Sequence, residues 1–261
     1  MKTNLTIHTI VKNEPFLYYA IKSIYDYCDT ILLYDTGSND AHTLEDIETL
    51  LSEDKNKKIV FKQISIYPDE EKWSVETIKK FTAERQNKFT KGRVRQIQIN
   101  DTKTKYFMLV DGDEVHYRAG MEKIVKELLP NNLYNNLCVG LPLIWFYDMD
   151  NLFTERTFPY NGRIMPTDAI YMNNDSPNEK HLMKENGNFF TYKHPKYLCY
   201  EDCTPYAHFE TVLKPWRRKH LVSKKNITPF LSAYPEVIYE NSYYIARWME
   251  KEKQPPKGQL L

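Results

Sequence analysis

The fold is decided by one stretch, LTIHTIVKNEPFLYYAIKSIYDYCDTILLYDTGSND, residues 5–40. Apolar residues dominate positions 5–11 and 30–34, and each run predicts a buried β-strand. Between the two runs apolar residues recur at helical spacing, and Asn13 and Pro15 are residue types favoured where a helix begins. A strand, a helix and a strand in this order predict two parallel strands joined by a crossover helix.

The alternation of strands and helices continues to residue 130. Further strands are predicted at 59–66 and 106–110. Three further helices are predicted: one that Thr43 caps, one over 74–99 with a break near Gly92, and one over 121–128. The strand at 106–110 is apolar at every position, as in a parallel strand that is covered on both faces. This order predicts an α/β fold with a mostly parallel sheet flanked by helices.

The pattern changes after residue 137. Longer, tyrosine-rich segments there predict antiparallel strands, and helical spacing predicts helices near 213–222 and 235–250. Residues 193–261 carry 12 Lys and Arg against 7 Asp and Glu, although the whole chain has a formal net charge of only +1. A basic terminal quarter favours an anionic partner, and a solvated surface explains the same charges equally well.

Composition bounds the class of protein. The 261 residues are 41% hydrophobic and 27% charged, which is typical of globular chains. No apolar run is long enough to predict a transmembrane helix, and the first residues lack the small-residue cleavage site of a signal peptide. We therefore expect a cytoplasmic protein, in the host cytoplasm if a phage encodes it, whose four cysteines remain thiols.

The sequence Asp-Gly-Asp-Glu at 111–114 follows the apolar strand directly. Carboxylates crowded at one strand end repel each other unless a cation neutralises them, and hard oxygen ligands favour Mg²⁺ or Mn²⁺. Gly112 would permit the turn that brings Asp111 and Asp113 towards one centre. The structural alternative is an acidic turn that caps the next helix.

A second polar loop, Asp-Thr-Gly-Ser-Asn-Asp at 35–40, follows the strand at 30–34. Ligands of parallel α/β sheets bind at the carboxyl ends of the strands, where a carboxylate can hold a ribose or a base edge. A turn leading into the next helix is the structural alternative, because Asp, Gly and Ser are common turn residues.

These segments together resemble family 2 glycosyltransferases of the GT-A fold, over a little under half of the chain. In that family the first strand ends in Val-Lys-Asn-Glu, as at 11–14, and the second in Asp-Thr-Gly-Ser-x-Asp, as at 35–40. An Arg-Asn pair then precedes an apolar strand that ends in Asp-x-Asp-Glu, as at 111–114. Here Arg95 stands at a fitting distance, followed by Gln96 in place of Asn.

The resemblance implies a GT-A (Rossmann-like) domain with an antiparallel and helical C-terminal acceptor region. It places a nucleotide-sugar-binding half at 1–136, an acceptor-binding and catalytic-base half at 137–250, and a loose tail at 251–261. The implied activity is metal-dependent, inverting transfer of a hexose or pentose from a UDP-sugar to an acceptor hydroxyl. Mn²⁺ or Mg²⁺ is the implied cofactor.

Individual roles carry over by position. The implied donor-binding residues are Ile10, Val11, Lys12, Asp35, Thr36, Gly37, Arg95, Asp111 and Gly112. The implied metal ligands are Asp111, Asp113 and a late histidine, His208. The base that an inverting transfer needs is expected in the second half, at Asp202 or Glu201, then at Asp168 or Glu179, although each of these is also a plausible surface acid.

Lys214, Trp216, Arg217 and Arg218 form the strongest basic cluster, which would bind the donor diphosphate or nucleic-acid phosphates, or would lie on a solvated helix face. The acceptor is therefore either a hydroxymethylated base in DNA, as some phages modify, or a surface glycan.

Three other interpretations stay open. The acidic loop also fits a haloacid-dehalogenase-like phosphatase, with Asp111 as nucleophile, Asp113 as general acid and Asp148 or Asp150 as a later acid. The chain could also be a non-catalytic binder of sugar nucleotides or nucleic acid. The residues His194, Cys199, Cys203 and His208 could bind zinc, but their spacing is poor, so we expect none.

Overall fold

The computed structural model describes residues 2–66, 91–130, 139–153, 161–167, 184–185, 188–189, 198–199, 206–209 and 227–240. Its centre is a seven-stranded sheet in the order β12-β6-β9-β4-β1-β2-β3. The strands are β1 (Leu5–Val11), β2 (Thr30–Asp35), β3 (Ile59–Gln63), β4 (Tyr106–Leu109), β6 (Val139–Leu141), β9 (Asn161–Pro166) and β12 (Leu198–Cys199). Strands β4, β1, β2 and β3 are mutually parallel, so the predicted α/β fold with a mostly parallel sheet is confirmed.

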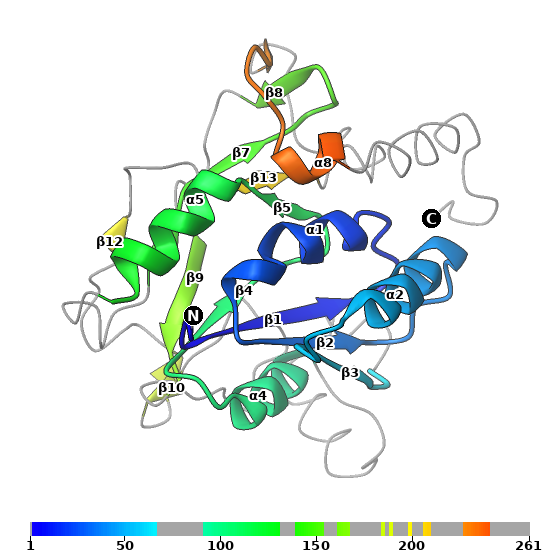
Figure 1. Cartoon of the computed structure of the whole chain (residues 1–261), viewed down its shortest axis with the longest axis vertical. Coiled ribbons are helices and arrows are strands. Elements are labelled where there is room, and N and C mark those ends of the chain that lie inside the picture. Colours follow the sequence, from blue (N-terminus) through cyan, green and yellow to red (C-terminus); the bar gives the residue numbers. More distant parts are fainter. Residues whose placement is uncertain are drawn as a thin grey trace.

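Helices cover both faces of this sheet (Figure 1). They are α1 (Leu17–Ile24) with a 3-10 turn (Tyr25–Tyr27), α2 (Ala41–Glu53), α4 (Lys91–Asp101), α5 (Arg118–Lys123) with a π-helical turn (Ile124–Leu128), and α8 (Glu236–Glu240). The main core joins α1, α2 and α5 to one face, where Ile7 and Val11 of β1 point. On the other face, Val94 of α4 packs against Leu32 and Tyr34 of β2.

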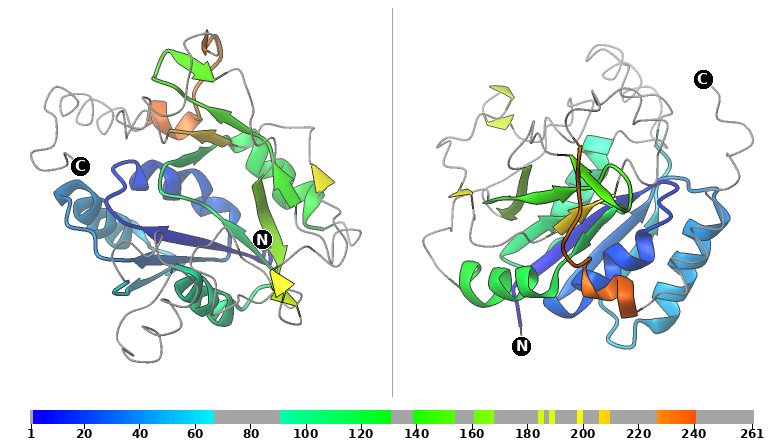
Figure 2. Two further views of the ribbon diagram at one scale, coloured as in Figure 1. Left: turned by 180° about the vertical axis from the view of Figure 1, so that it is seen from behind. Right: turned by 90° about the horizontal axis from the view of Figure 1, so that it is seen from above.

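A smaller sheet carries strands from both halves of the chain. Its order is β5 (Glu114–His116), β13 (Tyr206–His208), β7 (Leu143–Trp145). Strand β13 is antiparallel to β5 and parallel to β7. Two further pairs are antiparallel, β8 (Asn151–Phe153) with β14 (Ile227–Pro229), and β10 (Lys184–Glu185) with β11 (Asn188–Phe189). Figure 2 shows these elements from behind and from above.

The prediction of antiparallel strands after residue 137 is confirmed for most of the described pairs, but the predicted greater length was wrong and two pairs are parallel. Strands there span two to six residues, and the pairs β12–β6 and β13–β7 are parallel. Strand β9 is antiparallel to both β4 and β6. Apolar periodicity shows that a segment is extended, but it does not identify the strand with which the segment pairs.

Two predicted helix caps were also wrong. Helix α1 begins at Leu17, and its cap residue Phe16 makes no side-chain hydrogen bond. Helix α2 is capped by Asp40, whose carboxylate accepts from the backbone N–H of Thr43 at 3.0 Å. Helix α4 begins at Lys91, the first described residue after Ile66, so the predicted break near Gly92 is not tested.

Candidate functional site

The polar loops after β1, β2 and β4 meet at one edge of the sheet. Because these strands are parallel, their carboxyl ends lie side by side, and Val11 is directly opposite Asp35. The backbone N–H and the hydroxyl of Thr36 both donate to the carbonyl of Val11 at 2.9 Å. The structure therefore brings the predicted donor-binding segments 10–12 and 35–37 together.

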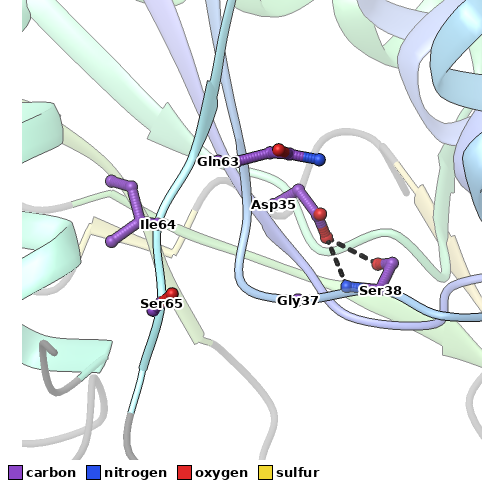
Figure 3. Close-up of a pocket in the computed structure, with 6 residues that line it drawn as sticks. All are labelled: Asp35, Gly37, Ser38, Gln63, Ile64 and Ser65. Carbon is purple, nitrogen blue, oxygen red and sulfur yellow. Dashed lines mark hydrogen bonds between the residues drawn. The ribbon is translucent and has the colours of Figure 1, made fainter.

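A pocket of about 200 Å³ opens at the ends of β2 and β3 (Figure 3). It is lined by Asp35, Gly37, Ser38, Gln63, Ile64 and Ser65. Asp35 is buried, and its Oδ1 accepts from the backbone N–H of Ser38 at 3.0 Å and from the Ser38 hydroxyl at 2.6 Å. This carboxylate therefore both shapes the turn and lines the pocket, so the structural and the ligand-binding interpretations of the loop are compatible.

Asn13, in the loop after β1, forms hydrogen bonds to the loop after β2. Its side-chain oxygen accepts from the backbone N–H groups of Asn39 at 2.9 Å and Asp40 at 3.0 Å, and its Nδ2 donates to Asn39 Oδ1 at 2.9 Å. Its backbone has φ of +57°, a left-handed conformation that asparagine tolerates better than most residues. Sequence reasoning assigned Asn13 to a helix cap, and an isolated Asn two residues after a strand was the available signal for this turn.

Two of the three carboxylates in the acidic loop pair with an arginine that sequence reasoning missed. Arg163 of β9 donates through Nη1 to Asp111 Oδ2 at 3.2 Å and through Nη2 to Glu114 Oε1. Its Nε donates to the hydroxyl of Tyr206 at 3.2 Å. A single Arg between apolar residues in the run NGRIMP was the only sequence signal of this contact.

Asp113 and His208, two of the predicted metal ligands, lie beside each other. The His208 Nε2 atom is 3.4 Å from Asp113 Oδ1, and the backbone N–H of Phe209 donates to the Asp113 carbonyl at 2.9 Å. The β5–β13 register creates this contact, because it sets His208 directly opposite Glu114. The ring of Trp145 covers the imidazole, with 5.8 Å between ring centroids.

Burial and charge act in opposite directions on these groups. Burial raises the pKa of Asp111, but the positive charges of Arg163 and Arg95 outweigh it and hold that pKa below its usual value. Burial lowers the pKa of His208, but the Asp113 carboxylate outweighs it and raises that pKa. Burial also raises the pKa of Glu114, against the opposing effect of Arg163.

Arg95 lies beneath the sheet edge on α4. It is 1% exposed, and its Nη1 donates to the carbonyl of His8 at 3.2 Å and to Gln98 Oε1 at 2.7 Å. Gln98 in turn donates to the carbonyls of Thr9 and Leu32 at 3.0 and 2.9 Å. Two roles were predicted for Arg95, positioning the diphosphate and positioning the acidic loop. These contacts favour a structural role of the second kind, because they hold the backbone of β1 and β2.

Gly112 is required for space. A Cβ atom there would lie 2.7 Å from Glu14 Cβ and 2.8 Å from Glu14 Cγ. Among the described glycines, positive φ occurs at Gly37, with φ of +103°, and not at Gly112. The predicted reason for Gly112, a special turn conformation, was therefore wrong: close approach of the first and third loops requires it.

Several predicted residues lie outside the described part of the chain. They are the candidate bases Asp168, Glu179, Glu201 and Asp202, the basic cluster Lys214, Trp216, Arg217 and Arg218, and the possible zinc ligands His194 and Cys203. Asp148, a later acid in the phosphatase interpretation, accepts from the backbone N–H of Asp150 at 3.0 Å and so stabilises a turn. Within the described residues, no group of three or more His, Cys, Asp or Glu side chains is arranged to hold a metal ion.

Comparison with known proteins finds similarity among solved structures only. No family model and no curated protein matches the chain. A crystal structure of UDP-glucose pyrophosphorylase complexed with UDP-glucose is similar over 64% of this chain and 77% of that chain, with 10% identity and a TM-score of 0.34. A likeness at that level carries no functional argument. No helix in the described segments is long and apolar enough to cross a membrane.

Proposed function

We propose that the chain is a metal-dependent glycosyltransferase of the GT-A type that uses a nucleotide-diphosphate sugar, with UDP-sugar as the expected donor. The observation that carries the proposal is that two chemically different sites lie at one edge of the sheet. One is the polar pocket at Asp35, and the other is the Asp113–His208 pair beside the acidic loop. A nucleotide sugar has a matching division, with a nucleoside at one end and a charged diphosphate that joins the nucleoside to the sugar.

The pocket suits a nucleoside. Asp35 uses Oδ1 to accept both hydrogen bonds from Ser38, and no donor among the described residues reaches its Oδ2. That oxygen can accept a hydrogen bond from a base N–H or a ribose hydroxyl. Gln63 lies next to Asp35 on the neighbouring strand and also lines the pocket, where its amide offers both a donor and an acceptor (Figure 3).

The second site, the Asp113–His208 pair, suits a divalent cation. Asp113 offers a carboxylate oxygen and His208 an imidazole nitrogen, a mixed donor pair compatible with Mn²⁺. Asp113 and His208 would hold the ion, with Asp111 next to it. When bound, the ion would supply positive charge for the diphosphate leaving group. Cleavage of the sugar–phosphate bond leaves an oxocarbenium-like sugar carbon for the acceptor hydroxyl to attack.

The acceptor end of the proposal rests on the sequence. Inverting transfer needs a base among Asp202, Glu201 and Asp168, and the basic cluster from Lys214 to Arg218 suits an anionic acceptor or the donor phosphates. A hydroxymethylated DNA base and a surface glycan both supply the required hydroxyl. A base in duplex DNA would have to leave the stack to reach this edge.

The proposal is tested with D113A and a matched acidic control, D150A. Each protein is incubated with Mn²⁺, a panel of UDP-sugars and either hydroxymethylated DNA or glycan acceptors, and products are detected by mass spectrometry. We expect sugar transfer by the wild type and D150A and a loss of at least about 100-fold in D113A. Full activity of D113A would contradict the metal role, and phosphate-monoester hydrolysis that D150A abolishes would favour the phosphatase.

A further inference from the structure

We propose that Arg163 is a positioning residue, an internal cation that holds Asp111 and Glu114 in place beside the Asp113–His208 pair. The inference concerns the order of the acidic loop, and it rests on the proposed function for the identity of the divalent ion and for the turnover that is measured. It assigns different tasks to three neighbouring carboxylates that look alike in the sequence.

The guanidinium is buried and fully engaged. Arg163 is 7% exposed, and such a charge is costly to bury unless it is paired and hydrogen-bonded. Its three nitrogens each reach a different residue: Asp111, Glu114 and Tyr206. It also lies over the ring of Tyr206, 5.5 Å from the ring centroid, and so connects β9 to β5 and β13.

Glu114 is occupied by contacts within the loop. Its Oε1 accepts from Arg163, and its Oε2 accepts from the backbone N–H of Asp111 at 3.0 Å. The Glu114 backbone N–H donates back to the Asp111 carbonyl at 3.1 Å. Glu114 is 0% exposed, so it organises the turn and does not offer an oxygen to a ligand.

Asp111 is held at one oxygen and open at the other. Its Oδ2 accepts from Arg163, whereas its side chain is 38% exposed. A guanidinium and a divalent cation that approach one carboxylate repel each other. Arg163 therefore weakens metal binding while it fixes the direction of Asp111, and these two effects have opposite signs.

The opposite signs separate positioning from plain structural support. Loss of a purely structural arginine would weaken both metal binding and turnover. Loss of Arg163 is expected to tighten Mn²⁺ binding and to slow turnover, because repulsion disappears together with the hold on Asp111. The substitution R163M is made in an E114Q background. Without E114Q, R163M would leave the buried Glu114 carboxylate unpaired.

The test compares R163M/E114Q with E114Q. Mn²⁺ affinity is measured by electron paramagnetic resonance without donor, folding by thermal melting, and turnover with a UDP-sugar. We expect Mn²⁺ to bind about 10-fold more tightly to R163M/E114Q, as for removal of one partly screened charge, and kcat to fall at least about 10-fold. Unchanged or weaker Mn²⁺ binding by folded R163M/E114Q would overturn the inference.

R163K is the second variant, because it keeps the charge and loses the planar fork. We expect its Mn²⁺ affinity to stay within about two-fold of the wild type, since the charge remains, and its kcat to fall. Full kcat in R163K would also overturn the inference. Mn²⁺ binding that follows these expectations in a protein without sugar transfer would contradict the proposed function and leave the role of Arg163 supported.

Discussion

Asp46 of α2 caps the neighbouring helix α1, and its burial predicts how the stability of the fold depends on pH. Its Oδ2 accepts from the backbone N–H of Tyr18 in the first turn of α1 at 3.2 Å, where Phe16 offers no side-chain cap. Asp46 is 3% exposed. Burial raises the pKa of Asp46 to about 7 from its ordinary 3.8, and the charge of Asp40 adds to the rise.

The sign of the pH dependence follows from this shift. The folded chain binds the Asp46 proton more tightly than the unfolded chain, so this group stabilises the fold fully below about pH 4. That contribution is lost as pH rises towards 7, because the Asp46 carboxyl then ionises in the folded chain as well. A shift of about 3 units corresponds to roughly 4 kcal/mol over this range.

D46N keeps an acceptor oxygen for Tyr18 and cannot ionise. We expect D46N and the wild type to differ in free energy of unfolding by less than about 0.5 kcal/mol at pH 4, and D46N to be more stable by up to roughly 4 kcal/mol at pH 8. Urea unfolding of both proteins from pH 4 to 8 measures the difference, in which all other titrations cancel. A difference that does not change with pH would refute the reasoning.

Three further predictions concern the loops and the core. G112A should lose about 2–3 kcal/mol in urea unfolding, because its Cβ would overlap Glu14, whereas G37A should lose only about 1 kcal/mol through its φ of +103° in open space; equal losses would contradict the steric explanation. N13G should keep the backbone turn but lose the side-chain clamp, so heteronuclear NMR should show faster motion in residues 35–40, and unchanged order there would contradict the clamp. Burial raises the pKa of the Cys28 thiol to about 12, so iodoacetamide should label Cys28 only in denaturant; peptide mass spectrometry that finds native labelling would contradict this.

The sequence predicts the first half of the sheet well because its signals are local. Strands β1, β2 and β4 are short runs of buried residues, and their parallel order follows from the helices between them. The approach of residues 10–12 to Asp35 then follows from topology alone. The metal, the activity and the acceptor are not decided by these signals and stay predictions.

The remaining features depend on contacts between distant positions. Arg163 meets Asp111 across 52 positions, and Asp46 caps α1 across 28. His208 reaches Asp113 only because β13 pairs with β5. Residue type alone cannot show such pairing, since an Arg in a short strand and an Asp on a helix surface are individually unremarkable positions.

The buried Arg163–Glu114 pair is better explained by function than by stability. Replacing a buried ion pair with apolar side chains is often neutral or stabilising, so stability alone gives little reason to keep one. Here the pair lies directly under Asp111, whose carboxylate remains 38% exposed at the sheet edge. Apolar side chains would fill the same volume but could not hold that carboxylate in one direction. If structural support were the only role, R163M/E114Q would bind Mn²⁺ more weakly than E114Q and would also turn over more slowly, which is the outcome that the geometry argues against.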